Sequence, residues 1–459
     1  MPRRHPRRCI RDRPTFPGGA PALALAIVAM LAGCLGPAPN PTASHVAPSV
    51  LGEPSPTDPS VAVLPTSIPE IDPVPWTTVE WRVVSDAIKG HAVAGRDRID
   101  DIIAGGPGLI AWGRVDQPGR NQFNDMAAIY RSADGHHWQV VPLDDGVGPL
   151  DGSEISIVAA GPIGDLALGD VCCTGEEQPA LWRSVDAVAW ERLAYPAELG
   201  DSALYRLIAT SDQFVVVGEL HGRARIWSSL DGQTWRGAGD VARGLGRGSV
   251  QDVASTDDGF IAVGRVEDDS GHYDGAVWRS SDGLTWNRQR VDLLEGDLDA
   301  VVTRVIPWAD GLLLLGQEGN HDERIRCEQA GSVGEIQPPA PGTRDFMCGW
   351  GREVHWITRD GSTWQRVIRV GEIDAPPARP GELIEFRLLA AGGPGLVSLG
   401  EGQDDGGASV FVSSDGISWQ ATRPRPQWKG GIVPAGFVIF DRTIVGVGDG
   451  LTVQIGTVR

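Results

Sequence analysis

The sequence predicts an all-β fold built from repeated units of four short strands. A turn motif centred on Asp-Gly and followed by tryptophan occurs six times in the 459 residues. A β-branched segment that ends in glycine precedes each copy. Successive copies are 45 to 55 residues apart, except for one interval of 78 residues. Units of this length with four strands each are typical of the blades of a β-propeller.

The turn motif places aromatic residues at fixed positions. An aromatic residue lies four positions before each aspartate and a tryptophan four positions after it, so ten of the 16 tryptophans belong to the repeat. Asp-Gly is a strong hairpin signal, because aspartate caps its own backbone and glycine accepts a positive φ. We therefore expect structural roles for Asp134, Trp138, Asp186, Trp190, Asp231, Trp235, Asp282, Trp286, Asp360, Trp364, Asp415 and Trp419. Ala187 stands where glycine is expected, which predicts a different second turn.

Two further strands precede each turn. Residues 102–113 and 253–264 each contain a β-branched run, a short turn and a second apolar run that ends in glycine. Together with the two strands that the Asp-Gly turn joins, they complete a unit of four strands. The loop between the second and third strands varies in length from unit to unit. Length variation on one face of a regular scaffold is typical of a binding function.

The last unit lacks its fourth strand. Residues 431–448 supply two strands and residues 451–458 a third. Near the other end, Trp81-Arg-Val-Val84 matches Trp138-Gln-Val-Val141, so we expect a strand at about 77–84 to close the ring. The sequence thus predicts a seven-bladed β-propeller over residues 76–459, without an open sheet edge. A six-bladed ring with extra terminal strands is the alternative.

Residues 1–33 predict an export signal. Six arginines come first, an apolar stretch too short to span a bilayer follows, and the segment leads into Leu31-Ala32-Gly33-Cys34. The last four residues resemble the lipobox of bacterial lipoproteins, which implies a lipid on Cys34 and an extracytoplasmic protein anchored to the cell membrane. An ordinary secretory signal is the alternative. The proline-rich residues 34–75 predict a disordered tether.

The charge of the chain argues against nucleic acid as a partner. The net charge is −20, and removal of residues 1–33 changes it to −25 because six arginines and one aspartate are lost. Binding to nucleic acid requires a basic face. The sequence does not define an oligomeric state.

The turn motif resembles the Asp-box, or BNR, repeat first associated with sialidases. The usual box has one more residue between aspartate and glycine. The resemblance covers residues 75–459 and implies structural boxes between the third and fourth strands, on the side opposite a catalytic pocket. Sialidases also need three arginines, a Tyr–Glu pair and an aspartate, and their N-terminal Arg-Ile-Pro signature is absent here. We therefore assign no catalytic residue.

Two loops between second and third strands carry cysteines. We expect no regular structure between Gln317 and Glu353, where a disulfide between Cys327 and Cys348 would restrain the loop in an oxidising compartment. Free thiols are the alternative. Cys172 and Cys173 are adjacent, and a vicinal disulfide, crossed pairs with the other two cysteines, or a reduced pair all remain open.

The loops also contain the candidate ligand-binding residues. These are Glu267, His272, Tyr273, Asp274, His321, Arg324 and Trp350. The acidic segment 267–274 has the oxygen density of a calcium site, but a solvated turn is the favoured interpretation. We predict no metal site and no cofactor. The leading function is binding of a glycan, peptide or protein partner without catalysis, and the rivals are a sialidase-like glycoside hydrolase and an assembly factor for an envelope complex.

Overall fold

The structure is a computed structural model of the chain. It describes residues 76–84, 98–105, 108–115, 126–142, 154–171, 178–238, 245–308, 311–332, 351–367, 385–393, 395–401, 408–422, 435–448 and 452–458. The expected export signal, Cys34 and the expected tether lie outside these residues. Within them, no helix is both long and apolar enough to span a membrane.

The described residues form an all-β fold of antiparallel sheets. Four four-stranded sheets follow the order of the chain. They contain β2 (Arg98–Gly105), β3 (Gly108–Val115), β4 (Met126–Ser132) and β5 (Gln139–Pro142); β6 (Glu154–Gly161), β7 (Gly164–Val171), β8 (Gln178–Ser184) and β9 (Trp190–Leu193); β18 (Asp299–Trp308), β19 (Gly311–Gly319), β20 (Arg352–Thr358) and β21 (Gln365–Val367); and β22 (Glu385–Gly392), β23 (Gly395–Glu401), β24 (Ala408–Ser413) and β25 (Gln420–Ala421).

An eight-stranded sheet lies between the second and third of these. Its strands are β10 (Ala203–Ala209), β11 (Phe214–Leu220), β12 (Arg223–Ser229), β13 (Arg236–Gly237), β14 (Arg247–Thr256), β15 (Gly259–Glu267), β16 (Tyr273–Ser280) and β17 (Asn287–Gln289). A single residue pair, Arg223 with Arg247, joins β12 to β14.

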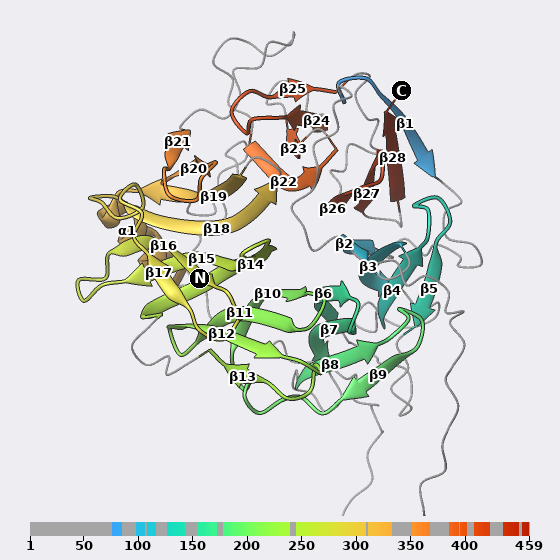
Figure 1. Ribbon diagram of the computed structural model, residues 1–459, viewed down its shortest axis with the longest axis horizontal. Helices are drawn as coiled ribbons and strands as arrows, with labels where there is room; N and C mark the ends of the chain where they lie inside the picture. The colour runs from blue at the N-terminus through green and yellow to red at the C-terminus, as the bar shows by residue number, and fades with distance from the viewer. Residues whose placement is uncertain are drawn as a thin grey trace, which may run out of the picture. The chain divides into compact units, whose positions relative to one another are not determined.

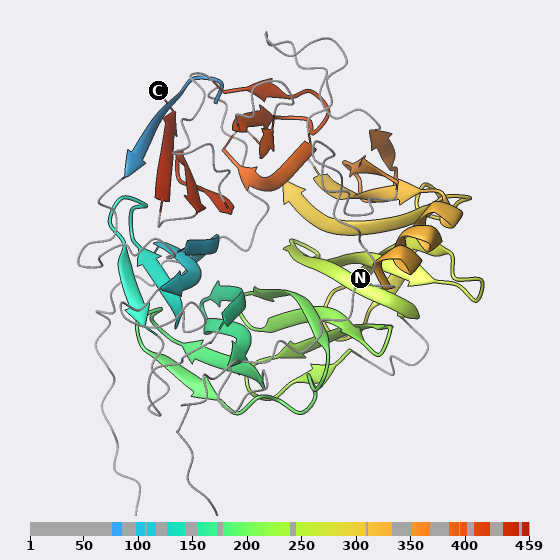
Figure 2. The same cartoon turned by 180° about the vertical axis from the view of Figure 1, so that it is seen from behind.

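A fifth four-stranded sheet unites the two ends of the described chain. It has the order β1-β28-β27-β26 and contains β1 (Val79–Val84), β26 (Gly436–Phe440), β27 (Thr443–Gly448) and β28 (Thr452–Val458). β1 pairs with β28 in antiparallel register, from Val79 opposite Val458 to Val84 opposite Val453. Both views show β1 beside β28 (Figures 1 and 2). The predicted closing strand is therefore confirmed.

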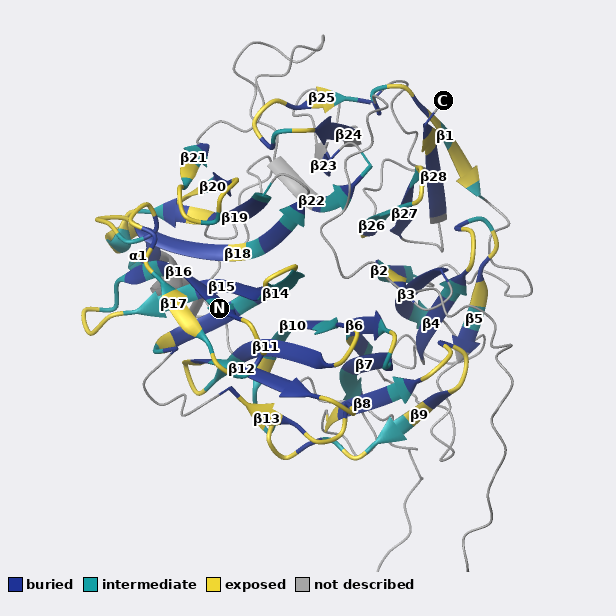
Figure 3. Ribbon diagram, in the orientation of Figure 1, coloured by how far each residue is buried: buried dark blue, intermediate teal, exposed yellow. Residues whose placement is uncertain are grey.

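The sheets are arranged as a β-propeller. The first strand of each unit contacts the first strands of its neighbours in the closed order β2, β6, β10, β14, β18, β22, β26 and back to β2. These strands surround the centre of the ring in Figure 1. The buried residues concentrate on the sheets and the exposed ones in the turns (Figure 3). Among the described residues, the core consists of seven apolar clusters, most of them formed where neighbouring sheets pack together.

A glycine within the second strand of six units has a defined steric role. Six first strands contain a register shift, and the glycine of the second strand pairs with the residue just before that bulge, as Gly218 does with Leu204. At Gly218 an added methyl group would overlap the carbonyl oxygen of Ala203. The same overlap with first-strand carbonyls occurs at Gly113, Gly169, Gly264 and Gly316. The absence of a side chain lets the bulged strand approach closely.

The six turns centred on Asp134, Asp186, Asp231, Asp282, Asp360 and Asp415, called the Asp turns below, lie between third and fourth strands as predicted. In each turn one carboxylate oxygen accepts hydrogen bonds of 2.6–2.9 Å from the backbone N–H groups two and three residues further on. A serine or threonine two residues earlier donates its hydroxyl to the same oxygen. The hydrogen bond from the Thr234 N–H contributes most to lowering the pKa of Asp231 to about 2.

The prediction that the second turn differs is wrong for its backbone. Ala187 adopts a φ of 57°, close to the 70–74° of the glycines at this place in the other turns. This left-handed conformation costs an alanine about 1 kcal/mol. The methyl group is fully buried in a cluster with Trp182 and Trp190, and burial of one such group returns about 0.8 kcal/mol.

The aromatic positions of the repeat are core positions. The residues four before each aspartate are at most 3% exposed: Tyr130, Trp182, Trp227, Trp278, Trp356 and Phe411. Trp138, Trp190, Trp235 and Trp419, which follow the turns, are also buried. Trp286 and Trp364 pack against core clusters while partly exposed.

The segment between Gln317 and Glu353, where no regular structure was expected, contains the end of a strand and a helix. β19 continues to Gly319, and α1 (His321–Ser332) follows. Asn320 caps this helix, because its side-chain oxygen accepts the N–H of Asp322 at 2.9 Å and its carbonyl that of Arg324 at 3.1 Å. An asparagine followed by two acidic residues in the first turn is the sequence signal that predicts such a start.

Candidate functional site

One group of charged residues, called the axial cluster, lies on the innermost strands. Its members are Asp101 on β2, Arg206 on β10, Asp252 on β14 and Arg304 on β18. Each follows directly after the bulge of its strand. A bulge changes the direction of the side chain that follows it. The shared position therefore brings charges from several sheets to the centre of the ring.

Asp252 lies between the two arginines of the axial cluster. Its side chain is 4% exposed, and its oxygens accept the backbone N–H groups of Val253 at 2.9 Å and Val305 at 3.0 Å. The Nε atoms of Arg206 and Arg304 lie 3.4 and 3.5 Å from the two carboxylate oxygens. The bond to Val305 also ties the first strand of one unit to that of the next.

The Nε donors of the two axial arginines form no hydrogen bond within the described residues. The side chains of Arg206 and Arg304 are 38% and 43% exposed. Each contacts Asp252 only as a long ion pair. A guanidinium carries five N–H donors in a planar fork that suits carboxylate and phosphate groups.

Asp101, on β2, is the fourth member of the axial cluster. Burial raises the pKa of Asp101, while the N–H of Ile102 and the charges of Arg206 and Arg304 lower it. Gly436 on β26 packs against it so closely that a methyl group there would overlap the Asp101 carboxylate. The sheet that closes the ring, to which β26 belongs, therefore restricts the position of the Asp101 side chain.

A second group, called the histidine cluster, consists of His272, Asp299 and His321. His272 ends the turn between β15 and β16, Asp299 begins β18, and His321 begins α1. Asp299 pairs with Gly319 in the β18–β19 ladder, which brings the helix start beside it. The turn before β16 and the segment after β19 are both loops between second and third strands. The cluster therefore lies at the end of the sheets opposite the Asp turns.

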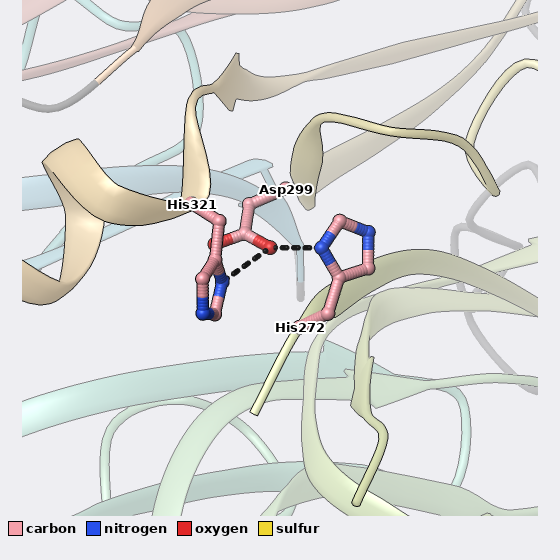
Figure 4. A group of neighbouring side chains, drawn as sticks. All are labelled: His272, Asp299 and His321. Atoms are coloured by element: carbon pink, nitrogen blue, oxygen red, sulfur yellow. Dashed lines mark hydrogen bonds and ion pairs between the residues drawn. The ribbon is translucent and has the colours of Figure 1, made fainter. Parts of the chain in front are cut away.

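Asp299 is the centre of this cluster (Figure 4). Its side chain is fully buried, and the imidazoles lie on either side of the carboxylate. His272 Nδ1 is 2.7 Å from Oδ1, and His321 Nδ1 is 3.0 Å from Oδ2. The side chains of the histidines are 18% and 31% exposed, so the cluster is open to solvent on one side.

Arg324 holds the carboxylate from the other side. This fully buried guanidinium donates its Nε–H to Asp299 and an Nη2–H to the carbonyl of Gly271. The N–H of Tyr273 donates to Oδ1 of Asp299 at 2.9 Å. Burial raises the pKa of Asp299, but the hydrogen bond from Arg324 and these other contacts outweigh it and keep that pKa below its usual range.

The Tyr273 ring packs between two guanidinium groups. Arg324 lies 3.5 Å and Arg265 lies 4.1 Å from the ring centroid, and the tyrosine is 7% exposed. Cation–π contact of this kind stabilises a buried arginine. The arrangement explains why α1, which starts at His321, packs at this place.

Several of the loop residues singled out from the sequence meet in one place. His272, Tyr273, His321 and Arg324 come together around Asp299, whereas Glu267 pairs with Arg247 at 2.9 Å. Asp274 is 3.8 Å from Nε2 of His272. In the acidic segment, an Asp268 oxygen accepts the N–H groups of Ser270 and His272, which is the hydrogen bonding of a turn.

Other predicted residues are not described. Cys172, Cys173, Cys348 and Trp350 lie outside the described residues. Cys327 lies in α1, but its side chain is not described, so no disulfide prediction is tested. Asp299 and the axial cluster were missed by the sequence analysis. The signal for the axial cluster was a charged residue inside an apolar strand, as in Val250-Gln-Asp-Val253, whereas Asp299 stands at a strand start and gave no such signal.

The fold defines the chain as a β-propeller protein. No family model matches the sequence, and no curated protein matches it. A GH74 xyloglucanase from Xanthomonas campestris is similar in structure with a TM-score of 0.45 and 15% identity, over 82% of this chain and 53% of the other, so the chain spans about half the length of that enzyme. The β-propeller domain of the Trilobed protease from Pyrococcus furiosus has a TM-score of 0.43 and 9% identity, over 79% and 94% of the two chains. Virginiamycin B lyase from Staphylococcus aureus has a TM-score of 0.42 and 11% identity, over 83% of this chain and 99% of the other.

Proposed function

We propose that the protein is a lipid-anchored, extracytoplasmic β-propeller that binds the acidic group of a glycan or peptide without catalysis. The observation that carries this proposal is the pair Arg206 and Arg304 on the innermost strands, whose side chains are 38% and 43% exposed and whose Nε atoms form no hydrogen bond in the described structure. The anchor and the location rest on the lipobox resemblance at Cys34.

Seven blades are part of the proposal. The single pair between β12 and β14 is a weak connection, and on either side of it the eight-stranded sheet consists of four consecutive strands. Counted as two blades, it joins five separate sheets. The closed sequence of contacts among seven first strands supports the same count.

The two arginines favour a carboxylate, sulfate or phosphate over a neutral ligand. Asp252 lies between them, forms a long ion pair with each, and accepts hydrogen bonds from two backbone N–H groups. An incoming carboxylate offers stronger, bidentate hydrogen bonds to each guanidinium. Asp101 and Asp252 offset the arginine charges, so the recognition would depend on hydrogen-bond geometry more than on net charge.

A sialidase-like hydrolase is the second candidate, because that chemistry also clamps a carboxylate with arginines. Two features weigh against it. Tyr273, the tyrosine with neighbouring carboxylates, is buried between two arginines rather than exposed as a nucleophile. It also lies beside the histidine cluster, where its N–H donates to Asp299, and not in the axial cluster.

Substitution of the axial arginines tests the binding function. Isothermal titration with a trimer of galacturonic acid should show binding to the wild type, and neutral trigalactose should not bind. Arg206→Ala and Arg304→Ala should each weaken binding roughly tenfold or more, because each removes charge-assisted hydrogen bonds. Arg290→Ala changes an exposed arginine and serves as the control. Equal binding of the neutral sugar, or unchanged affinity in both variants, would contradict the proposal, and release of monosaccharide would favour the hydrolase.

Substitution of Cys34 tests the anchor. Cys34→Ala should move the protein from the membrane fraction to the soluble fraction of the cells, because no thiol remains to carry the lipid. Cys9→Ala, also within the N-terminal segment, should leave the protein with the membranes. Immunoblots of the two fractions provide the measurement. A Cys34→Ala protein that stays membrane-bound would show that the lipobox assignment is wrong.

A further inference from the structure

We propose that His272, Asp299 and His321 form a binding site for a divalent transition-metal ion, and specifically for Zn²⁺. The site is separate from the axial cluster and does not depend on the proposed ligand. It replaces the expectation from the sequence that the chain has no metal site. The donors come from three segments that lie far apart in the sequence, which is why spacing alone did not indicate it.

The chemistry of the donors selects the ion. Two imidazoles and one carboxylate suit zinc and the other late first-row transition metals, whereas calcium and magnesium prefer a ligand set of oxygen atoms only. Three protein ligands and an open position for water are typical of catalytic zinc sites, whereas structural zinc sites have four protein ligands. The partial exposure of both histidines leaves such a position accessible to solvent.

The distances need only a small adjustment. One donor atom from each residue can be chosen so that all lie within 4.8 Å of one another. Nδ1 of His272 and Nδ1 of His321 lie 2.7 and 3.0 Å from the carboxylate oxygens. Donors bound at about 2.1 Å to one tetrahedral ion lie roughly 3.4 Å apart. A slight outward shift of the two exposed rings therefore makes room for the ion.

The surroundings of the cluster already position the ligands. Arg324 and the N–H of Tyr273 hold the Asp299 carboxylate. Nε2 of His272 has no hydrogen-bond partner within the described structure and lies 3.8 Å from Oδ1 of Asp274. When Nδ1 binds the ion, the ring proton resides on Nε2, and Asp274 is placed to accept it. A carboxylate behind a ligating histidine is a common support of metal sites.

Arg324 is the feature that opposes a cation, since its Nη2 lies 3.4 Å from His321 Nδ1. Its charge is paired with Asp299 and screened by the Tyr273 ring 3.5 Å away. The guanidinium donates to Oδ2, which His321 Nδ1 also approaches at 3.0 Å, whereas Oδ1 lies 2.7 Å from His272 Nδ1 and 3.3 Å from His321 Nδ1. We therefore expect the ion at Oδ1 of Asp299, between the two imidazoles.

Titration of the full chain with zinc chloride tests the site. Calorimetry at pH 7.5 should show one bound ion in the wild type, and Co²⁺ should give the visible absorption of a tetrahedral complex. His272→Ala and His321→Ala should each weaken zinc binding roughly a hundredfold or more. His136→Ala, a histidine in an Asp turn at the opposite end of the sheets, is the matched control and should bind like the wild type.

A second pair of variants separates metal binding from hydrogen bonding to Asp299. His272→Asn and His321→Asn keep an N–H donor near the position of Nδ1 but remove the imidazole, so they should fold and fail to bind zinc. Zinc should raise the thermal midpoint of the wild type and not of these variants. The proposal is overturned if the wild type binds no zinc, or if the double asparagine variant binds it as tightly as the wild type.

Discussion

Gly218→Ala is expected to destabilise the protein by about 3 kcal/mol or more. The new methyl group would overlap the carbonyl oxygen of Ala203 and crowd the Cα of Leu204. Both contacts are backbone atoms of the bulged strand β10, which cannot turn aside as a flexible side chain would. Relief requires β10 and β11 to separate, and their hydrogen bonds are lost with that movement.

Urea unfolding followed by tryptophan fluorescence measures this effect. The matched control is Gly296→Ala, since nothing lies within 4 Å of a methyl group at that exposed glycine and its φ is not positive. The control should change stability by no more than about 0.5 kcal/mol. If Gly218→Ala unfolded at the same urea concentration as Gly296→Ala, the steric account of the repeated glycines would be wrong. Insoluble Gly218→Ala protein beside soluble control would support it.

Asp165→Asn is expected to stabilise the protein at pH 8 and to have little effect at pH 4. Asp165 is 2% exposed and occupies the position of Leu109, Phe260 and Leu312 in other units. Burial, with a smaller contribution from the Asp186 carboxylate, raises its pKa from 3.8 to about 7, although the N–H groups of Gly161 and Ala187 act to lower it. The folded state therefore resists ionisation of this group.

The sign of the effect follows from the two pKa values. Below pH 3.8 the carboxyl group is neutral in both states and imposes no penalty. Between pH 3.8 and 7 the unfolded chain ionises first, so stability falls as the pH rises, and above pH 7 the loss is constant. A difference of about three units corresponds to about 4 kcal/mol, which the asparagine variant would recover.

Thermal unfolding of variant and wild type at pH 4, 6 and 8 provides the measurement. The difference in stability between the variant and the wild type is the relevant quantity. The Asp turns stabilise both proteins less as the pH falls and their aspartates become protonated, and this effect cancels in the difference. Asp258→Asn, at an exposed aspartate, should differ little from the wild type at every pH. A difference between Asp165→Asn and the wild type that does not grow from pH 4 to pH 8 would contradict the account.

The sequence was sufficient to predict the parts of the fold that arise from local chemistry. Asp-Gly turns, tryptophans at fixed distances and a recurrent glycine after the second apolar run define repeated units without knowledge of the neighbouring units. The match between Trp81-Arg-Val-Val84 and the fourth strand of the first unit was enough to place β1 beside β28. Each of these predictions depended on residues close together in the chain.

The candidate sites could not be predicted in the same way, because they form between units. Asp299 was not singled out, since a lone aspartate at a strand start is ordinary until His272 and His321 are brought to it. Arg206 and Arg304 lie about a hundred residues apart and meet only because two bulges have equivalent positions. The missed helix α1 was different, because its capping signal at Asn320 was present in the sequence.

The pairing of β1 with β28 has a consequence for the order of folding. These are the first and the last strands that the structure describes, and they hydrogen-bond to each other in one sheet. A chain that leaves the ribosome or crosses a membrane from its N-terminus presents β1 long before β28. Until then β1 has no partner, and the first strand β2 lacks its neighbour β26. Closure is therefore a late event, and an interrupted chain exposes unpaired strand edges of the kind that chaperones recognise.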